Sequence, residues 1–171
     1  MSQEPKDNSC DEQVFDELFR THSRDLHNFL YYKYGSAFNP KDVVQDAFIK
    51  LWDNCEKVMP EKARSFLFTV ANNKMLNEVA RRKTVVNYRQ EKPKSHTEES
   101  PQYIMEGNEY MDRLQQAIES LTEEQRVTFM LNRIEGKKHK EIAHMLGISR
   151  KAVEKRIYTA LAILREKVGK I

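Results

Sequence analysis

The chain has 171 residues, 39% of them hydrophobic, and a formal net charge of +3. Five glycines and five prolines are too few for an all-β protein full of tight turns, and every periodic segment is typical of helix. No apolar run is long enough for a membrane-spanning helix, and the polar start lacks the apolar stretch of a secretory signal. We therefore expect an all-α, soluble, cytoplasmic protein that does not insert into membranes.

The charge is unevenly distributed along the sequence. Lysines and arginines minus aspartates and glutamates give −5 for residues 1–61, +7 for 62–94, −6 for 95–135 and +7 for 136–171. Two basic blocks between acidic ones favour two separate contacts with a polyanion, with other surfaces left for protein. The alternative is chance clustering of solvated charges.

The only cysteines, Cys10 and Cys55, lie far apart and show no Cys-x-x-Cys or Cys/His ligand spacing. We therefore expect no metal site, and nothing in the sequence calls for a cofactor. Because thiols stay reduced in the cytoplasm, both cysteines are predicted to be free, with Cys55 as a small buried or half-buried group.

Three helices are predicted in the N-terminal part, at about residues 13–34, 40–54 and 61–83. Asn39 is expected to cap the second helix with its side chain, and Pro40 takes the first helical position. Residues 11–83 should form one small domain resembling a three-helix bundle.

Helical periodicity fails over residues 84–107, where the segment QEKPKSHTEESPQ is polar and holds two prolines. We expect a flexible linker there. Helices resume near Asn108, and Thr122 to Gln125 form a capping box that opens a helix ended by Gly136. Residues 108–171 are thus predicted to form a second small helical domain.

Residues 138–160, KHKEIAHMLGISRKAVEKRIYTA, predict a helix-turn-helix. Gly147 should end the first helix in the left-handed conformation, Ile148 fill the turn and Ser149 cap the second helix. The second helix is expected to bury Val153, Ile157, Ala160, Leu161 and Leu164. Its opposite side is basic, as in a helix that enters the DNA major groove. The alternative is an ordinary helical hairpin with solvated cations.

Three motifs occur in a characteristic order. Residues 42–52, DVVQDAFIKLW, resemble the polymerase-binding helix of bacterial sigma factors of the extracytoplasmic-function class. Residues 64–74, RSFLFTVANNK, resemble the minus-ten helix of that class, and residues 121–164 resemble its fourth region, which reads the minus-thirty-five element. The resemblance implies sigma region 2 in the first domain, sigma region 4 in the second, and a promoter-specificity subunit that is not itself an enzyme.

The resemblance implies that the helix over residues 42–52 docks onto the coiled coil of the polymerase β′ subunit. Two carboxylates and an amide at helical spacing can form charge-assisted bonds with arginines there. The residues expected in this contact are Asp42, Gln45, Asp46, Phe48, Ile49 and Trp52. The alternative is a solvated helix face above two core aromatics.

The minus-ten contact calls for cations along the DNA backbone, with aromatic or amide groups for unstacked bases. The residues expected to supply them are Lys62, Arg64, Phe68, Asn72, Asn73, Lys74, Arg81 and Arg82. The resemblance makes residues 53–59 the wall of a pocket for one flipped base. Phe68 stands where a tyrosine often does, so a hydroxyl contact is lost.

The minus-thirty-five contact should combine base reading with phosphate binding. Arginine and lysine can read guanine and glutamate can accept from cytosine, whereas other cations hold phosphates. The residues expected in this contact are Lys138, Lys140, Ser149, Arg150, Lys151, Glu154, Lys155, Arg156 and Tyr158. Thr159 falls where some relatives carry a base-reading arginine, so no relative's promoter sequence can be carried over.

The partners implied are core RNA polymerase through its β′ and β subunits, promoter DNA and an anti-sigma factor, with the free protein a monomer. One alternative is a stand-alone helix-turn-helix regulator that acts as a dimer, but it leaves residues 42–52 without a role. A helical enzyme or nuclease is a second alternative, and it would need an acidic cluster for Mg²⁺ that the sequence does not offer.

Overall fold

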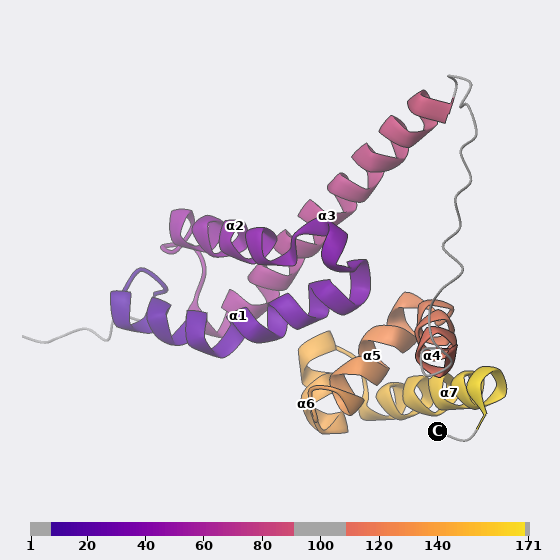
Figure 1. Ribbon diagram of the computed structural model, residues 1–171. Coiled ribbons are helices and arrows are strands. Elements are labelled where there is room, and N and C mark those ends of the chain that lie inside the picture. Colours follow the sequence, from indigo (N-terminus) through magenta and orange to yellow (C-terminus); the bar gives the residue numbers. More distant parts are fainter. Residues whose placement is uncertain (1–7, 91–108, 170–171) are drawn as a thin grey trace, which may run out of the picture. The chain divides into compact units, whose positions relative to one another are not determined.

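The computed structural model describes residues 8–90 and 109–169. Within these ranges all regular structure is helical, and the chain divides into two compact units, Met1–Lys94 and Ser95–Ile171 (Figure 1). The predicted all-α architecture of two small domains is confirmed. None of the helices in the described ranges is long and apolar enough to cross a bilayer.

The first unit packs three helices around one core. They are α1 (Glu12–Tyr34), α2 (Pro40–Asp53) and α3 (Pro60–Gln90), and a short 3-10 turn, η1 (Ser36–Phe38), joins the first two. The core includes Leu26, Leu30, Val43, Ala47, Leu51, Ala63, Leu67, Ala71 and Met75. Leu76 continues the apolar spacing of α3, yet its side chain is exposed. Met75 is buried instead, because the buried row of α3 advances by four residues at each step.

The predicted side-chain cap at Asn39 is wrong. Pro40 does open α2, but Asn39 adopts the left-handed conformation, with φ at 48°, and its side chain makes no capping bond. Asparagine tolerates this conformation better than most residues, so Asn39 serves the tight turn between η1 and α2. Its backbone carbonyl still accepts from the N–H of Asp42 at 3.1 Å.

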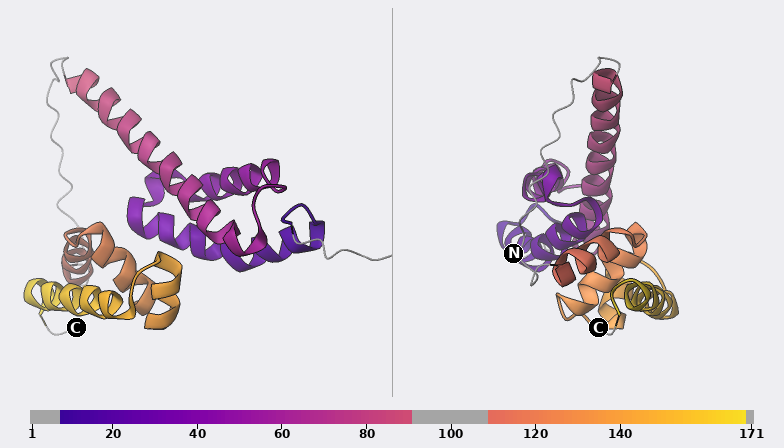
Figure 2. Two further views of the ribbon diagram at one scale, coloured as in Figure 1. Left: turned by 180° about the vertical axis from the view of Figure 1, so that it is seen from behind. Right: turned by 45° about the vertical axis from the view of Figure 1, so that its right-hand side comes forward.

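Helix α3 is longer than the sequence predicted. Its last residues, 84–90, belong to the segment assigned to a flexible linker, yet they continue the helix without a break. Adding residues to an existing helix requires no new nucleation, and 84–90 contain neither glycine nor proline. Figure 2 shows this end of α3 projecting beyond α1 and α2. The rest of the predicted linker, residues 91–107, lies outside the described residues.

The second unit contains α4 (Glu109–Glu119), α5 (Glu123–Arg133), α6 (His139–Leu146) and α7 (Arg150–Val168). The predicted capping box is confirmed: the N–H of Gln125 donates to Thr122 Oγ1 at 3.3 Å, and the Gln125 side chain accepts from the N–H of Thr122 at 3.1 Å. One cluster of its apolar side chains comprises Ala117, Leu121, Phe129, Ala160 and Leu164.

The prediction of two free thiols is wrong. Cys10 and Cys55 form a disulfide between the segment before α1 and the connection from α2 to α3. Sequence spacing could not reveal this pair, because the two cysteines meet only after α1 and α2 have packed side by side.

Candidate protein and nucleic-acid interfaces

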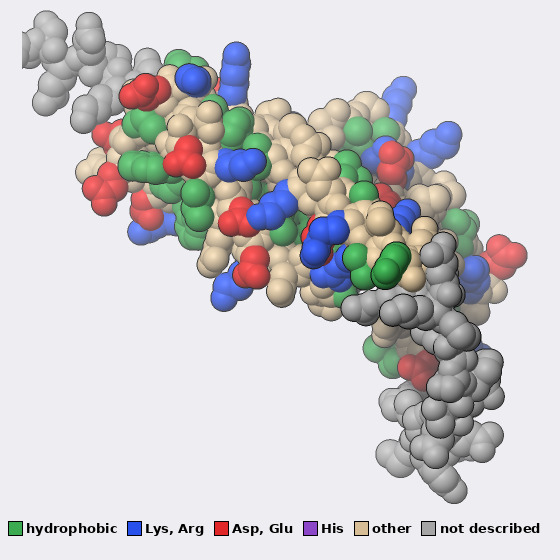
Figure 3. All heavy atoms as spheres, turned by 90° about the horizontal axis from the view of Figure 1, so that it is seen from above, with side chains coloured by type: hydrophobic (Ala, Val, Ile, Leu, Met, Phe, Trp, Pro, Cys, Tyr) green, Lys and Arg blue, Asp and Glu red, His purple; other side chains and the backbone are tan. Residues whose placement is uncertain are grey.

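The outer side of α2 carries most of the residues predicted to bind polymerase. Asp42 and Gln45 are exposed, Ile49 is 58% exposed and Trp52 is 47% exposed. Figure 3 shows green hydrophobic and red acidic side chains next to each other on the surface of the molecule. We call Asp42, Gln45, Asp46, Ile49 and Trp52 the α2 face.

Phe48 does not belong to the α2 face. Its ring is only 4% exposed and lies in the core, 6.0 Å between centroids from Phe15 and 4.9 Å from Phe19. The predicted surface contact for Phe48 is therefore corrected to a core role. The Trp52 ring, by contrast, makes an edge-to-face contact with the Phe15 ring, with 5.1 Å between centroids, and is still partly exposed to a partner.

Asp46 of the α2 face is paired within the protein. Its carboxylate accepts a hydrogen bond from the ammonium of Lys74 on α3. Because Asp46 is predicted to bind protein and Lys74 to bind DNA, this ion pair connects the two predicted surfaces.

Several predicted minus-ten residues lie open on α3. Lys62, Asn73 and Lys74 are exposed, and Arg64 is half-buried. Phe68 is also half-buried, with its ring 5.2 Å from that of Phe29, so only part of its surface is open for stacking. The loop over residues 54–59 precedes α3 directly.

Asn72 is held by two residues that the sequence did not single out. Its side-chain oxygen accepts from Lys33 Nζ at 2.9 Å and from Tyr34 Oη at 2.6 Å. The ammonium of Lys33 also lies over the rings of Phe29 and Tyr34. No sequence signal connects α1 to Asn72, because the contact spans 38 residues and depends on how α1 packs on α3.

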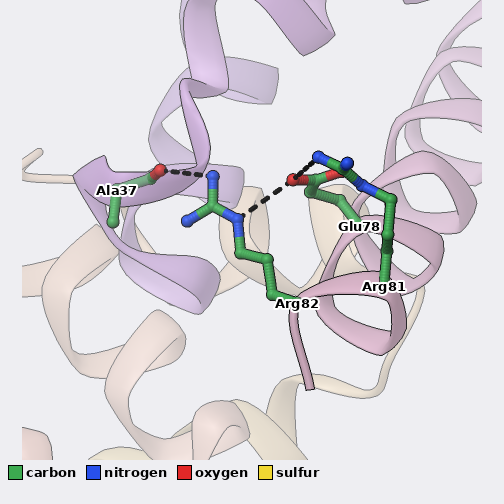
Figure 4. A network of polar contacts seen from close by, with 4 residues as sticks. All are labelled: Ala37, Glu78, Arg81 and Arg82. Atoms are coloured by element: carbon green, nitrogen blue, oxygen red, sulfur yellow. Dashed lines mark hydrogen bonds and ion pairs between the residues drawn. The ribbon is translucent and has the colours of Figure 1, made fainter. Parts of the chain in front are cut away.

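Arg81 and Arg82 form a polar network around Glu78 (Figure 4). Arg81 donates twice to the Glu78 carboxylate, at 2.9 and 3.0 Å, and Arg82 donates once at 3.0 Å. These hydrogen bonds, that of Arg81 first, lower the pKa of Glu78 to about 2. The same bond raises the pKa of Arg81. Arg82 also donates to the Ala37 carbonyl at 2.8 Å and stacks on Phe38, so it fastens α3 to η1.

The helix-turn-helix forms as predicted. Gly147 has a left-handed φ of 67°, and the N–H of Ile148 donates to the Ala143 carbonyl at 3.0 Å. Ser149 Oγ accepts from the N–H of Ala152 at 3.1 Å and caps α7. The predicted buried side of α7 is confirmed at Val153, Ile157, Ala160 and Leu164, whereas Leu161 is half-buried. The hydroxyl of Ser149 thus has a structural task.

The outer side of α7 divides into open and paired residues. Lys151 and Lys155 are exposed and Tyr158 is 68% exposed. Glu154 accepts from Arg150 at 3.0 Å and lies 3.6 Å from His139 of α6. Arg156 pairs with Glu124 of α5 at 2.8 Å, which ties the two helices together and engages a cation predicted to hold phosphate.

A basic hollow lies where α6 and α7 begin. It is open to solvent and has a volume of about 480 Å³. Its lining comprises Asn132, Gly136, Lys137, Lys138, His139, Lys140 and Arg150. Both Lys138 and Lys140, predicted to bind phosphate, therefore reach the same concave surface as Arg150.

No group of three or more His, Cys, Asp or Glu side chains suited to a metal ion occurs within residues 8–90 and 109–169. Four carboxylates of the interfaces described above pair with arginine or lysine instead, namely Asp46, Glu78, Glu124 and Glu154.

Two family models match the chain in order. Sigma-70 region 2 matches residues 18–85, and sigma-70, region 4 matches residues 111–164. The first covers most of α1 and α3 and all of α2, and the second covers most of α4 to α7 with the helix-turn-helix.

Curated relatives agree with these matches. The ferric citrate uptake sigma factor FecI of Escherichia coli K12 is 30% identical over 88% of this chain and 87% of its own length. The ECF RNA polymerase sigma factor SigL of Mycobacterium tuberculosis is 30% identical over 86% of this chain and 85% of its own. SigE of Mycolicibacterium smegmatis is 27% identical, and the chain spans only 62% of its length.

A solved structure shares the fold. The sigma factor RpoE of Bartonella quintana, crystallised with the anti-sigma factor NepR, superposes with a TM-score of 0.57 at 18% identity, over 90% of this chain and 96% of that one. A stand-alone regulator is not favoured, because both sigma regions occur in one chain and in order. The chain therefore belongs to the sigma-70 family as an extracytoplasmic-function sigma factor, a transcription initiation factor that directs RNA polymerase to specific promoters.

Proposed function

We propose that the α2 face docks this sigma factor onto the β′ subunit of core RNA polymerase, with further contacts to β, in the cytoplasm. The observation that carries this proposal is the row of exposed acidic, amide and apolar side chains on α2, from Asp42 to Trp52. Carboxylates and an amide match arginines on a partner helix, while Ile49 and Trp52 offer apolar area at the same face.

Helix α3 and the loop over residues 54–59 would hold the melted minus-ten strand. Lys62 is an exposed cation that would neutralise a phosphate, and Lys74 would do so on leaving its ion pair with Asp46. Asn73 is an exposed amide able to bind a base edge. Asn72 is fixed by Lys33 and Tyr34 with its oxygen occupied, so its amide NH₂ is the group left to face a base. Arg81 remains a phosphate ligand in this proposal, whereas Arg82 serves mainly to fasten η1.

Helix α7 would read the minus-thirty-five element. Lys151, Lys155 and Tyr158 are the open side chains, and the Arg150–Glu154 pair presents a donor and an acceptor at neighbouring positions. Lys138 and Lys140 line the basic hollow and would take phosphates, which position α7 without specifying sequence.

The free protein would be a monomer that an anti-sigma factor holds inactive. RpoE of Bartonella quintana was crystallised with such a partner, NepR. An anti-sigma factor here would cover the α2 face, since any protein bound there excludes polymerase.

Charge reversal on the α2 face tests the docking proposal. Asp42→Lys is preferable to a change at Asp46, because a lysine at 46 would meet Lys74 and disturb the fold. Loss of a charge-assisted contact should weaken binding of core polymerase at least tenfold, measured by fluorescence anisotropy with labelled protein. Circular dichroism checks the fold, since a lysine in the first turn opposes the helix dipole.

Glu17→Lys is the matched control, because it reverses an exposed carboxylate on α1 instead of α2. It should leave core binding within twofold of wild type. Equal core affinity for wild type and Asp42→Lys would contradict the docking proposal.

Two lysines of the second unit test how the minus-thirty-five element is read. Lys151→Ala should change the ranking of promoters in a randomised minus-thirty-five library, because a base-reading contact discriminates by about 1–3 kcal/mol. Lys140→Ala should weaken all promoters alike and reduce the slope of log affinity against log salt by about one. Identical promoter rankings in wild type and Lys151→Ala would remove Lys151 from base recognition.

A further inference from the structure

The start of the described chain is fastened to the loop between α2 and α3. Ser9 is fully buried, and its hydroxyl donates to the Val58 carbonyl at 2.6 Å. The neighbouring Cys10 forms the disulfide with Cys55. Figure 1 shows the beginning of α1 and the α2–α3 connection at the same end of the unit. We call Ser9 and Cys10 the N-terminal clamp.

The clamp holds the loop at two points. Cys55 and Val58 are three residues apart, and both belong to a tight turn in which the N–H of Cys55 donates to the Trp52 carbonyl and that of Val58 to the Asn54 carbonyl. Helix α3 begins at Pro60, directly after this loop. The loop therefore connects the α2 face to the DNA-binding helix, and the clamp fixes its position relative to α1.

Of the two attachments, only the disulfide is a covalent bond, and a reductant can open it. In a compartment where thiols are kept reduced, a disulfide is usually a transient, redox-sensing bond. Cys10 and Cys55 are both half-buried, so small oxidants and reductants can reach them. After reduction, the hydrogen bond from Ser9 to the Val58 carbonyl would still attach the start of the described chain to the loop.

We propose that Cys10 and Cys55 form a redox switch that sets how firmly the loop over residues 54–59 holds the minus-ten strand. The proposal rests on the proposed function of α3 and that loop. In the disulfide form the loop is fixed before DNA arrives, so less entropy is lost when a flipped base binds. In the dithiol form the loop must be ordered on binding, and minus-ten affinity falls.

The chemistry balances with a peroxide as oxidant and a dithiol as reductant. One thiolate attacks hydrogen peroxide and becomes a sulfenic acid with release of hydroxide, and the second thiol displaces water to form the S–S bond. Overall, two thiols and one peroxide give one disulfide and two waters. A protein or small-molecule dithiol reverses the step by thiol–disulfide exchange and is itself oxidised to a disulfide.

The test uses the full-length protein treated with hydrogen peroxide or with dithiothreitol, and thiols are counted by alkylation and mass spectrometry. With core polymerase bound, the oxidised form should bind a fluorescent single-stranded minus-ten oligonucleotide three- to tenfold more tightly than the reduced form. Hydrogen exchange of residues 54–59 should be faster after reduction. Cys10→Ser and Cys55→Ser should match reduced wild type under both treatments.

Ser9→Ala is the matched control, because it removes the hydrogen bond to Val58 and keeps the disulfide, so it should still respond to redox state. The proposal is overturned if both forms bind the oligonucleotide equally, or if dithiothreitol cannot open the bond in the folded protein. Binding to core polymerase separates the failure of the switch from the failure of the proposed function. If the protein binds core polymerase but its affinity for the oligonucleotide does not depend on redox state, only the switch is contradicted. If neither form binds core polymerase, the proposed function is contradicted, and the switch with it.

Discussion

Individual side chains in this sigma factor often serve the fold and a predicted interface at once. Lys74 neutralises Asp46, Arg156 joins α7 to α5, and Ser149 caps α7. A sequence pattern reports that a residue is polar and on the outer side of a helix. It does not show which side chain of the same protein pairs with that residue. This pairing decides how freely the residue can contact DNA or polymerase.

Tyr34 offers a test at the scale of one residue. Tyr34→Phe removes the donor that lies 2.6 Å from the Asn72 oxygen and should lower the free energy of unfolding by about 1 kcal/mol. Because Asn72 is then held by Lys33 alone, promoter opening should also fall, measured by permanganate reactivity of unpaired thymines. Tyr31→Phe, at an exposed tyrosine of the same helix, should leave opening unchanged. Normal opening in Tyr34→Phe would show that the amide needs no such support.

At the scale of one element, α3 combines several tasks along its length. Its first part is packed in the core through Ala63, Leu67, Ala71 and Met75, whereas Val85, Val86 and Tyr88 near its end are exposed. Between them, Arg82 bonds Glu78 on its own helix and the Ala37 carbonyl of η1, and so holds the helix to η1. Core packing therefore stabilises the first half of α3, and the polar network around Glu78 stabilises the part of the helix that follows the core.

The Glu78 network predicts a pH dependence. The pKa of Glu78 is lowered from 4.5 to about 2 in the folded protein, so its contribution to stability is complete above 4.5 and is lost as the pH falls toward 2. Wild type should melt at a higher temperature than Glu78→Gln at pH 6, and this difference in melting temperature should disappear as the pH falls from 4.5 toward 2. The difference should be small and should shrink in 0.5 M salt, since exposed ion pairs are screened. A gap that widens on acidification would contradict this role.

At the scale of the whole molecule, the chain consists of two units with separate cores. Each unit contributes its own predicted DNA contact, so two modest interactions joined in one chain can bind a promoter more tightly than either alone. Such an arrangement suits a protein that must recognise two promoter elements at once.

Separate cores predict separate effects of core mutations. Leu67→Ala should destabilise the first unit by about 2–5 kcal/mol and lower the midpoint temperature of only one of two calorimetric transitions. Leu131→Ala should lower the midpoint temperature of the other transition by a comparable amount, since Leu131 is fully buried in the second unit. Leu76→Ala, at an exposed leucine, should shift neither by more than a degree or two. A single transition that moves in all core variants would mean that the two units unfold together.

The sequence by itself determined the local features of this protein. Helical spacing, Gly147, Ser149 and the Thr122 capping box act within a few residues of chain, so they predicted the helix-turn-helix and its buried side correctly. The order of three motifs predicted the family for the same reason, since each motif is a continuous segment.

Only the tertiary structure decided the features that join distant segments. The disulfide of Cys10 with Cys55, the support of Asn72 by Lys33 and Tyr34, and the burial of Phe48 all depend on how α1 packs against α2 and α3. Spacing along one helix gives the side on which a residue lies but not the partner it meets there. For that reason the sequence located the interfaces, and packing decided which of their residues remain open.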